Sequence, residues 1–310
     1  MYGPNFTFLG IPACDLDKPE SYKGADVIIV GAPIDSGTSH RSGAKFGPQA
    51  IRMGDYLPHD GERPHLALRI DGLKELKIFD AGDLLMPPGN LEEALLVLKK
   101  ATEKISRAGA IPVVLGGDHS IASADVAGIA EHLGKGRVSM IHFDAHADTG
   151  DLQFGALVGH GTPMRRLIDS GYVRGDRFLQ LGLRGYWPDD VTLNWMKDKG
   201  MRSYEMTEIH HRGLTKVLDE SFATLTKDCD GVFLSVDIDV VDPGMAPGTG
   251  TPEAGGLTSR ELLKVIRSFG DMNIVGADVV EVAPAYDHAQ MTGIAASHVI
   301  YDLLSVMAPS

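Results

Sequence analysis

Short apolar runs rich in Val, Ile and Leu recur along the chain, and polar, Gly- or Pro-containing segments separate them. Strands of a parallel sheet are buried on both faces, so they read as nearly continuous apolar stretches of this kind. Seven runs therefore predict strands: ADVIIVGAP (25–33), LKIFDAGD (76–83), IPVVLGGDHS (111–120), RVSMIHFDAHAD (137–148), RFLQLGLRG (177–185), GVFLSVDIDVV (231–241) and NIVGADVVEVAP (273–284).

The segments between these runs carry a helical pattern. Within 91–109 the apolar residues form one stripe at 3.6-residue spacing (Leu91, Leu95, Leu98, Ala101 and Ile105). The segment 259–270 begins with a Ser in a capping position and ends at a Gly. Alternating strands and helices predict an α/β fold with a mainly parallel sheet covered by helices on both faces. Residues 1–310 contain no Pro/Ser-rich linker, repeat or low-complexity segment, which predicts a single domain.

Residues that carry chemistry are concentrated at the ends of four predicted strands, in the sequences GGDHS, DAHAD, DIDVVDP and EVAP. In open parallel sheets, ligands bind outside the carboxyl ends of the strands. The pattern therefore predicts a functional site at this edge of the sheet.

The spacing of these residues indicates a metal site. In DAHAD, Asp and His side chains alternate with Ala, so in an extended chain they leave one face of the strand. Four carboxylates in a poorly solvated site repel one another unless protons or cations neutralise them. The donor set is larger than one ion needs and suits two divalent ions with shared carboxylates, and mixed imidazole and carboxylate ligands favour Mn, Zn, Ni or Fe over Ca or Mg. The six predicted ligands are His119, Asp144, His146, Asp148, Asp237 and Asp239.

Charge and composition bear on the binding partners and the cellular location of the protein. The formal net charge of −13 disfavours a nucleic-acid partner and weakly favours a small cationic ligand. No run of 18 apolar residues predicts a membrane span, and the first residues lack the basic and apolar regions of a signal peptide. Cys14 and Cys229 have no metal-type spacing and indicate a reduced, cytoplasmic setting.

Several blocks resemble the ureohydrolase family, which includes arginase and agmatinase. The resemblance rests on LGGDHS, HFDAHAD and SVDIDVVDPGMAPGTGTPEAGG, and extends to GAPIDSGTSHRSGAKFGPQAIR, GHGTPMRRLIDSG and DVVEVAPAYDHAQMTG. It implies a three-layer α/β/α fold, as in arginases and deacetylases, around an eight-stranded parallel sheet. It also implies two Mn²⁺ ions per chain, with Ni²⁺ as the alternative, and a homo-oligomer, either a trimer or a hexamer.

The resemblance implies a role for each ligand. One ion would be held by His119, Asp144, Asp148 and Asp237. The second would be held by Asp144, His146, Asp237 and Asp239, so that Asp144 and Asp237 bridge the pair. Two such ions lower the pKa of a shared water toward neutrality, which supplies a nucleophile for an unreactive guanidinium carbon.

Three catalytic roles also follow from the resemblance. Glu281 would pair with the substrate guanidinium, His160 would bind substrate and carry a proton to the leaving amine, and Asp239 would orient the nucleophile. Plain structural roles remain open, because Glu281 could pair with a nearby Arg and His160 could be an exposed loop residue. His142 is expected to lie behind the ligands, and Asp242, which precedes Pro243, is expected to form a turn.

Agmatine, cleaved to putrescine and urea as in polyamine biosynthesis, is the leading substrate. Guanidinobutyrase, guanidinopropionase and proclavaminate amidinohydrolase activities are the alternatives within the family, and the loops 149–159 and 243–256 are expected to decide among them. Three other classes compete: a mononuclear deacetylase-like amidohydrolase, a dinuclear phosphoesterase, and a non-catalytic subunit with a ureohydrolase fold. A metal content of two ions per chain would exclude the first of these.

Overall fold

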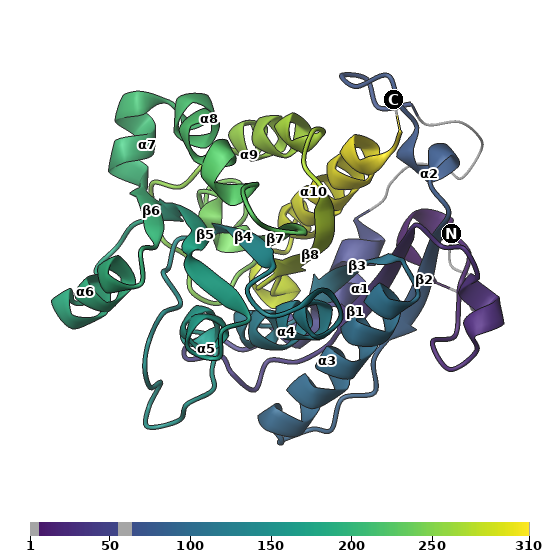
Figure 1. Cartoon of the computed structure of the whole chain (residues 1–310), viewed down its shortest axis with the longest axis horizontal. Coiled ribbons are helices and arrows are strands. Elements are labelled where there is room, and N and C mark those ends of the chain that lie inside the picture. The colour runs from purple at the N-terminus through teal and green to yellow at the C-terminus, as the bar shows by residue number, and fades with distance from the viewer. Residues whose placement is uncertain (1–5, 55–63, 310) are drawn as a thin grey trace.

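A computed structural model describes residues 6–54 and 64–309 of the chain. Its centre is a sheet of eight parallel strands in the order β2-β1-β3-β8-β7-β4-β5-β6 (Figure 1). The fold class predicted from the sequence is therefore confirmed. The strands are β1 (Val27–Ala32), β2 (Ile78–Asp83), β3 (Ile111–Gly116), β4 (Val138–Phe143), β5 (Val173–Leu183), β6 (Arg202–Glu205), β7 (Gly231–Asp237) and β8 (Ile274–Val280).

Helices cover both faces of the sheet. One face packs against α3 (Leu91–Arg107), α4 (Ala122–Leu133) and α5 (Pro163–Asp169). The other forms the larger apolar core with α1 (Gly47–Met53), α7 (Met206–Arg212), α8 (Leu214–Leu225), α9 (Ser259–Ile266) and α10 (Met291–Met307). The short α2 (Gly72–Glu75) lies against α10, and α6 (Asp190–Asp198) follows β5. Within the described residues, no helix combines the length and apolar character that a membrane crossing requires.

The seven apolar runs of the sequence correspond to all strands except β6. This strand has four residues, lies at the edge of the sheet and is largely exposed, so it lacks the continuous apolar signal of a buried strand. The predicted capping residue of 259–270 is wrong by one position. Thr258, not Ser259, is the N-cap, since its Oγ1 accepts from Glu261 N while the Glu261 carboxylate accepts from Thr258 N, which forms a capping box.

The strand order places the chemistry-bearing segments side by side. The four strands that precede GGDHS, EVAP, DIDVVDP and DAHAD are β3, β8, β7 and β4, and these are consecutive neighbours in the middle of the sheet. Because all strands are parallel, their carboxyl ends meet at one edge. The edge predicted to hold the site therefore carries all four segments within a short distance.

Candidate active site

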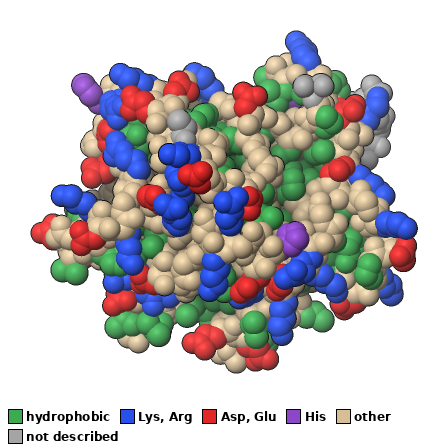
Figure 2. Space-filling model, in the orientation of Figure 1, with side chains coloured by type: hydrophobic (Ala, Val, Ile, Leu, Met, Phe, Trp, Pro, Cys, Tyr) green, Lys and Arg blue, Asp and Glu red, His purple; other side chains and the backbone are tan. Residues whose placement is uncertain are grey.

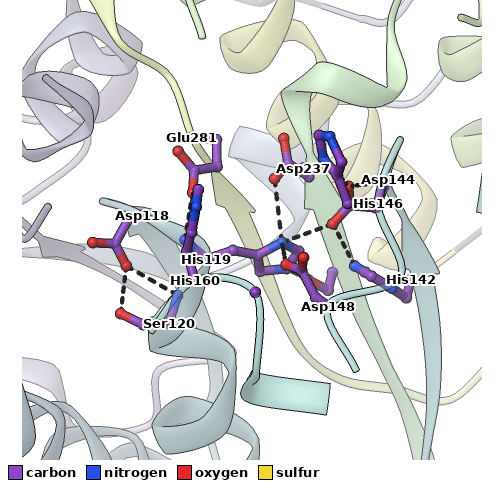
Figure 3. A network of polar contacts seen from close by, with 12 residues as sticks. Asp118, His119, Ser120, His142, Asp144, His146, Asp148, His160, Asp237 and Glu281 are labelled. Atoms are coloured by element: carbon purple, nitrogen blue, oxygen red, sulfur yellow. Dashed lines mark hydrogen bonds and ion pairs between the residues drawn. The ribbon is translucent and has the colours of Figure 1, made fainter. Parts of the chain in front are cut away.

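Three carboxylates surround one nitrogen of His119. Its Nδ1 lies 3.0 Å from Asp144 Oδ2, 3.1 Å from Asp148 Oδ2 and 3.2 Å from Asp237 Oδ2 (Figure 3). All four side chains are at least nine-tenths buried. Residues from three different strand ends are thus brought together around a single point.

A second group adjoins the first. His146 Nδ1 lies 3.0 Å from Asp239 Oδ2 and 3.4 Å from Asp144 Oδ1. Asp144 belongs to both groups, with one oxygen directed to each. The structure therefore brings together all six side chains that the sequence singles out, and it places Asp144 between the two halves.

The turns that follow the strands create this convergence. The extended DAHAD geometry expected from the sequence is wrong, because β4 ends at Phe143 and Asp148 has a left-handed backbone with φ of 51°. Backbone N–H groups hold one oxygen of Asp144, Asp237 and Asp239 in place. His146 N donates to Asp144 Oδ1 at 2.6 Å, Asp239 N to Asp237 Oδ1 at 2.8 Å and Ala145 N to Asp239 Oδ1 at 3.0 Å. The first two bonds each span two residues and let the side chain end its strand, and the third joins the ends of β4 and β7.

The arrangement fits metal ions. His119 Nδ1 and Asp239 Oδ2 are buried, yet neither has a hydrogen-bond partner of acceptable geometry among the described residues. Ligand atoms at right angles around one ion, with bonds of about 2.1–2.2 Å, stand about 3.0 Å apart. The oxygens around His119 Nδ1 lie at 3.0–3.2 Å from it, which matches this spacing. Buried carboxylates without matching donors require neutralisation, which cations at this spacing would supply.

His142 also lies beside Asp144, but both of its ring nitrogens are occupied. Its Nε2 is 2.8 Å from Asp144 Oδ2, and its Nδ1 is 3.1 Å from the Gln180 amide nitrogen. Because the amide donates to Nδ1, the proton of the neutral ring is on Nε2 and points at Asp144. His142 therefore supports a carboxylate from behind, in agreement with its expected place below the ligands.

Glu281 and His160 form a pair above the metal-site residues. His160 Nδ1 lies 2.8 Å from Glu281 Oε1, which also accepts from His119 N at 2.9 Å. The other oxygen of Glu281, Oε2, is buried and has no partner among the described residues. On the far side of the imidazole, Ser39 Oγ is 2.6 Å from His160 Nε2. Ser39 N also donates to this Nε2 at 3.0 Å, so Nε2 acts as an acceptor and the ring proton lies on Nδ1, facing Glu281.

The pair shifts the pKa of both partners. Burial lowers the pKa of His160, but the adjacent Glu281 carboxylate outweighs this effect and raises it to about 9. Burial raises the pKa of Glu281, and the His160 charge and the His119 N–H outweigh it, so the pKa stays below its usual range. The sequence allowed Glu281 to be a structural partner of an Arg, and the structure shows that its partner is His160.

This pairing predicts a pH-dependent stability. Since the pKa of His160 rises from 6.5 to about 9 on folding, the stabilisation is fully present below pH 6.5 and is lost as the pH rises through 9. We expect the difference in free energy of unfolding between the parent and His160→Gln to shrink by up to about 3 kcal/mol across this window. Urea denaturation of the metal-free proteins at a series of pH values measures it. A difference that stays constant from pH 6 to 10 would contradict the ion pair.

A cavity of about 520 Å³ opens above the ligands. His146, Asp148 and Asp237 form part of its floor, and His160 lies at its wall. Its outer part is lined by Phe154, Tyr186, Trp187, Arg184 and Glu253. The Arg184 guanidinium donates to backbone carbonyls of Gly182, Asp239, Glu253 and Ala254. Its role is therefore to hold the loop that carries Glu253.

Sequence reasoning missed the residues that fix His160. Gln153 Nε2 donates to Gly37 O at 2.8 Å, and Gln153 Oε1 accepts from Gly161 N at 2.7 Å. Asp118 Oδ2 accepts from Gly37 N at 2.7 Å, while burial and the nearby Glu281 raise its pKa to about 6. These bonds join loops distant in sequence, and no spacing pattern marks them. Of these residues, only Asp118 could have been singled out from the sequence, because it belongs to the GGDHS segment at the end of a predicted strand.

Comparison with known proteins gives consistent results. The model of the Arginase family matches residues 25–305. The guanidinobutyrase of Pseudomonas aeruginosa is 35% identical over 311 residues, which cover 99% of this chain and 93% of that protein. The mitochondrial agmatinase of Gallus gallus is 38% identical over 290 residues, covering 93% and 82%. The solved proclavaminate amidinohydrolase of Streptomyces clavuligerus superposes with a TM-score of 0.87 at 36% identity, covering 99% of this chain and 98% of that one.

Proposed function

The chain belongs to the arginase family, and from this premise we propose that it hydrolyses agmatine to putrescine and urea at a dinuclear Mn²⁺ centre. As a member of this family it is a hydrolase that acts on the C–N bonds of guanidino compounds. The observation that carries the proposal is the convergence of three carboxylates around the unpartnered His119 Nδ1, beneath a cavity that also exposes His160.

We assign the metal ligands from this convergence. His119, Asp144, Asp148 and Asp237 would hold one ion, and Asp144, His146, Asp237 and Asp239 the other. The shared position of Asp144 supports its role as a bridge, and imidazole with carboxylate is a donor set suited to Mn²⁺, with Ni²⁺ as the alternative. When bound, the two ions supply Lewis acidity and an activated water near neutral pH.

The remaining roles belong to side chains of the chain itself. Glu281 would accept an N–H of the substrate guanidinium through Oε2, which is buried and has no partner among the described residues. His160 would then donate a proton to the leaving nitrogen, with Ser39 N and Oγ beside its Nε2. Asp239, held through Oδ1 by Ala145 N, keeps Oδ2 free to orient the attacking water.

The charge of the cavity supports an amine-tailed substrate. Among the lining residues that the structure describes, Arg184 is the one arginine, no lysine occurs, and the Arg184 donors bind backbone carbonyls. Glu253 and the exposed ring of Tyr186 remain at the outer wall. A carboxylate and an aromatic ring favour an ammonium group, such as the free end of agmatine. The similarity to a guanidinobutyrase makes a carboxylate-tailed substrate the competing proposal.

A substrate panel tests the activity. We expect the Mn-loaded protein to release urea from agmatine with a higher kcat/KM than from arginine, 4-guanidinobutyrate or 3-guanidinopropionate. We also expect Glu253→Gln to lower the preference for agmatine over 4-guanidinobutyrate, because it removes a charge from the wall. A higher kcat/KM for a carboxylate-tailed compound would contradict agmatine as the substrate and leave the hydrolase assignment intact. Absence of urea from every guanidino compound would support a non-catalytic subunit instead.

Metal binding is expected to stabilise the fold, because it neutralises buried carboxylates. At a concentration about 100 times the dissociation constant, two Mn²⁺ ions should raise the Tm by about 5–10 °C over the chelator-treated protein. Differential scanning fluorimetry with MnCl₂ and a metal analysis giving two ions per chain would measure this. MgCl₂ is the control, since imidazole-containing sites bind Mg²⁺ poorly. Equal shifts with both salts would contradict a specific site.

The distribution of charge on one face of the molecule bears on a nucleic-acid partner. On the face drawn in Figure 2, basic and acidic side chains alternate instead of forming one large basic area. Ion pairs such as Arg174–Asp176 and Arg137–Asp230 also place opposite charges side by side at the surface. This agrees with a small-molecule substrate and not a nucleic acid. A trimer or hexamer and a cytoplasmic location stay proposals, and sedimentation velocity would test the first.

A further inference from the structure

A row of buried polar side chains runs across the sheet just below the proposed ligands. The strand register pairs Asp278 on β8 with Ser235 on β7, Ser235 with His142 on β4, and His142 with Gln180 on β5. All four side chains are fully buried. Two residues earlier on the same face, the positions are apolar, with Phe233, Met140 and Phe178 packed in one cluster. The polar row is therefore a distinct layer between the apolar core and the metal-site residues.

Part of this row connects directly to His119. The His119 Nε2 lies 2.9 Å from Ser235 Oγ, and Ser235 Oγ donates to Asp278 Oδ1 at 2.8 Å. Since the one hydroxyl proton of Ser235 is donated to Asp278, Ser235 Oγ accepts from His119 Nε2, which therefore carries a proton. The chain of hydrogen bonds therefore runs away from the metal site and ends on an ionised Asp278.

A second carboxyl group meets the end of this chain. Asp125, on helix α4, is fully buried, and its side chain interacts with that of Asp278. Asp125 Oδ1 accepts from Val126 N at 2.6 Å. The Oδ2 atoms of both Asp125 and Asp278 are buried, and neither has a donor among the described residues. Two buried carboxyl groups in contact without a donor cannot both be ionised, so one proton must lie between them.

We propose that Asp125 is a positioning residue that carries this proton, donates it to Asp278 and thereby fixes the direction of the hydrogen-bond chain that ends at His119. The inference rests on the proposed metal site. Asp278 already accepts from Ser235, which stabilises its charge, whereas within residues 6–54 and 64–309 the Asp125 carboxyl accepts from one backbone N–H, that of Val126. Burial and the neighbouring Asp278 raise the pKa of Asp125 well above its usual value, which agrees with this assignment.

The direction of the chain matters for metal binding. If the proton-donating side chain of Asp125 were removed, the buried Asp278 would take up a proton from solvent. Asp278 could then donate that proton to Ser235. Ser235 would then donate to His119 Nε2, and the His119 proton would move to Nδ1, the atom that faces the metal site. That tautomer cannot bind a cation through Nδ1. Asp125 thus excludes the unproductive tautomer without touching a ligand.

The test measures Mn²⁺ binding to the metal-free full-length chain by isothermal titration calorimetry. Asp125→Ala removes the donor, whereas Asp125→Asn is the matched control, because its amide still donates to Asp278. We expect Asp125→Ala to raise the Mn²⁺ dissociation constant about 10-fold, as for loss of a group that supports a metal ligand, and Asp125→Asn to stay close to the parent. In a Ser235→Ala background, where the chain is already broken, Asp125→Ala should have no additional effect.

A spectroscopic measurement completes the test. Infrared spectra of the Mn²⁺-loaded protein labelled with ¹³C-aspartate, recorded above pH 8 so that Asp118 is ionised, should show the carbonyl band of a protonated carboxyl group, and this band should vanish in Asp125→Asn. Absence of the band in the parent overturns the proposal, even if Asp125→Ala fails to fold. Equal weakening by Asp125→Ala and Asp125→Asn also overturns it, as does a full Asp125→Ala effect in the Ser235→Ala background. A parent chain that binds no Mn²⁺ would instead contradict the proposed metal site.

Discussion

Asp144→Asn is expected to reduce urea release from agmatine by about 1,000-fold or more, since several kcal/mol of transition-state stabilisation depend on the metal centre. Asp144 directs Oδ2 to His119 and Oδ1 to His146, so it is the one carboxylate within 3.5 Å of both histidines. An amide of the same shape has no charge and one oxygen acceptor, which prevents it from bridging two cations. Steady-state urea release and the metal content per chain together measure the effect.

The matched control is Asp176→Asn. This carboxylate also belongs to a strand, β5, but it is exposed and pairs with Arg174 at the surface. We expect normal activity and two ions per chain in the control. If Asp144→Asn retained its metal and most of its activity, the bridging role would be wrong.

Glu281→Gln is expected to lower kcat/KM for agmatine by about 100-fold, which corresponds to about 3 kcal/mol for a buried charge pair. Glu281 Oε2 has no partner among the described residues, whereas Oε1 binds His119 N and His160 Nδ1. The Gln amide can keep the Oε1 contacts but places an N–H group where the guanidinium must donate. The substitution therefore removes the attraction for the substrate and leaves the shape of the site.

A second measurement separates this effect from simple damage to the fold. Glu281 raises the pKa of His160 to about 9, so its removal should lower that pKa. A proton donor with a lower pKa loses its proton at lower pH, and the alkaline limb of the activity profile should move toward neutral pH. Glu103→Gln, at a surface ion pair on α3, is the control and should change neither quantity. An unchanged alkaline limb in Glu281→Gln would contradict the pairing.

The apolar runs predict most of the sheet because burial on both faces leaves a strong local signal. They do not predict β6, whose contacts at the sheet edge leave its side chains largely exposed. Local pattern also cannot give the strand order, which depends on packing between segments more than 100 residues apart. The structure alone shows that β8 and β7 lie between β3 and β4.

The proposed metal ligands are predictable because Asp and His residues directly follow apolar strands in the sequence. Burying several such carboxylates costs free energy unless protons or cations neutralise them. The residues that support the site from behind, such as Asp125 and Gln153, have no comparable pattern in the sequence. Asp125 lies on helix α4, and Gln153 lies in the loop 149–159. Their partners, Asp278 and Gly37, are distant in the chain, so their roles follow only from the tertiary structure.

The strand order has a consequence for how the protein is made. A chain synthesised as far as residue 230 already contains His119, Asp144, His146 and Asp148, yet β7 and β8, which separate β3 from β4, do not exist at that point. The two halves of the sheet must therefore remain apart, with exposed strand edges, until the last quarter of the chain inserts between them. If the proposed metal site is correct, its ligands come together only after β7 and β8 are in place, so we expect high-affinity metal binding only by completed chains.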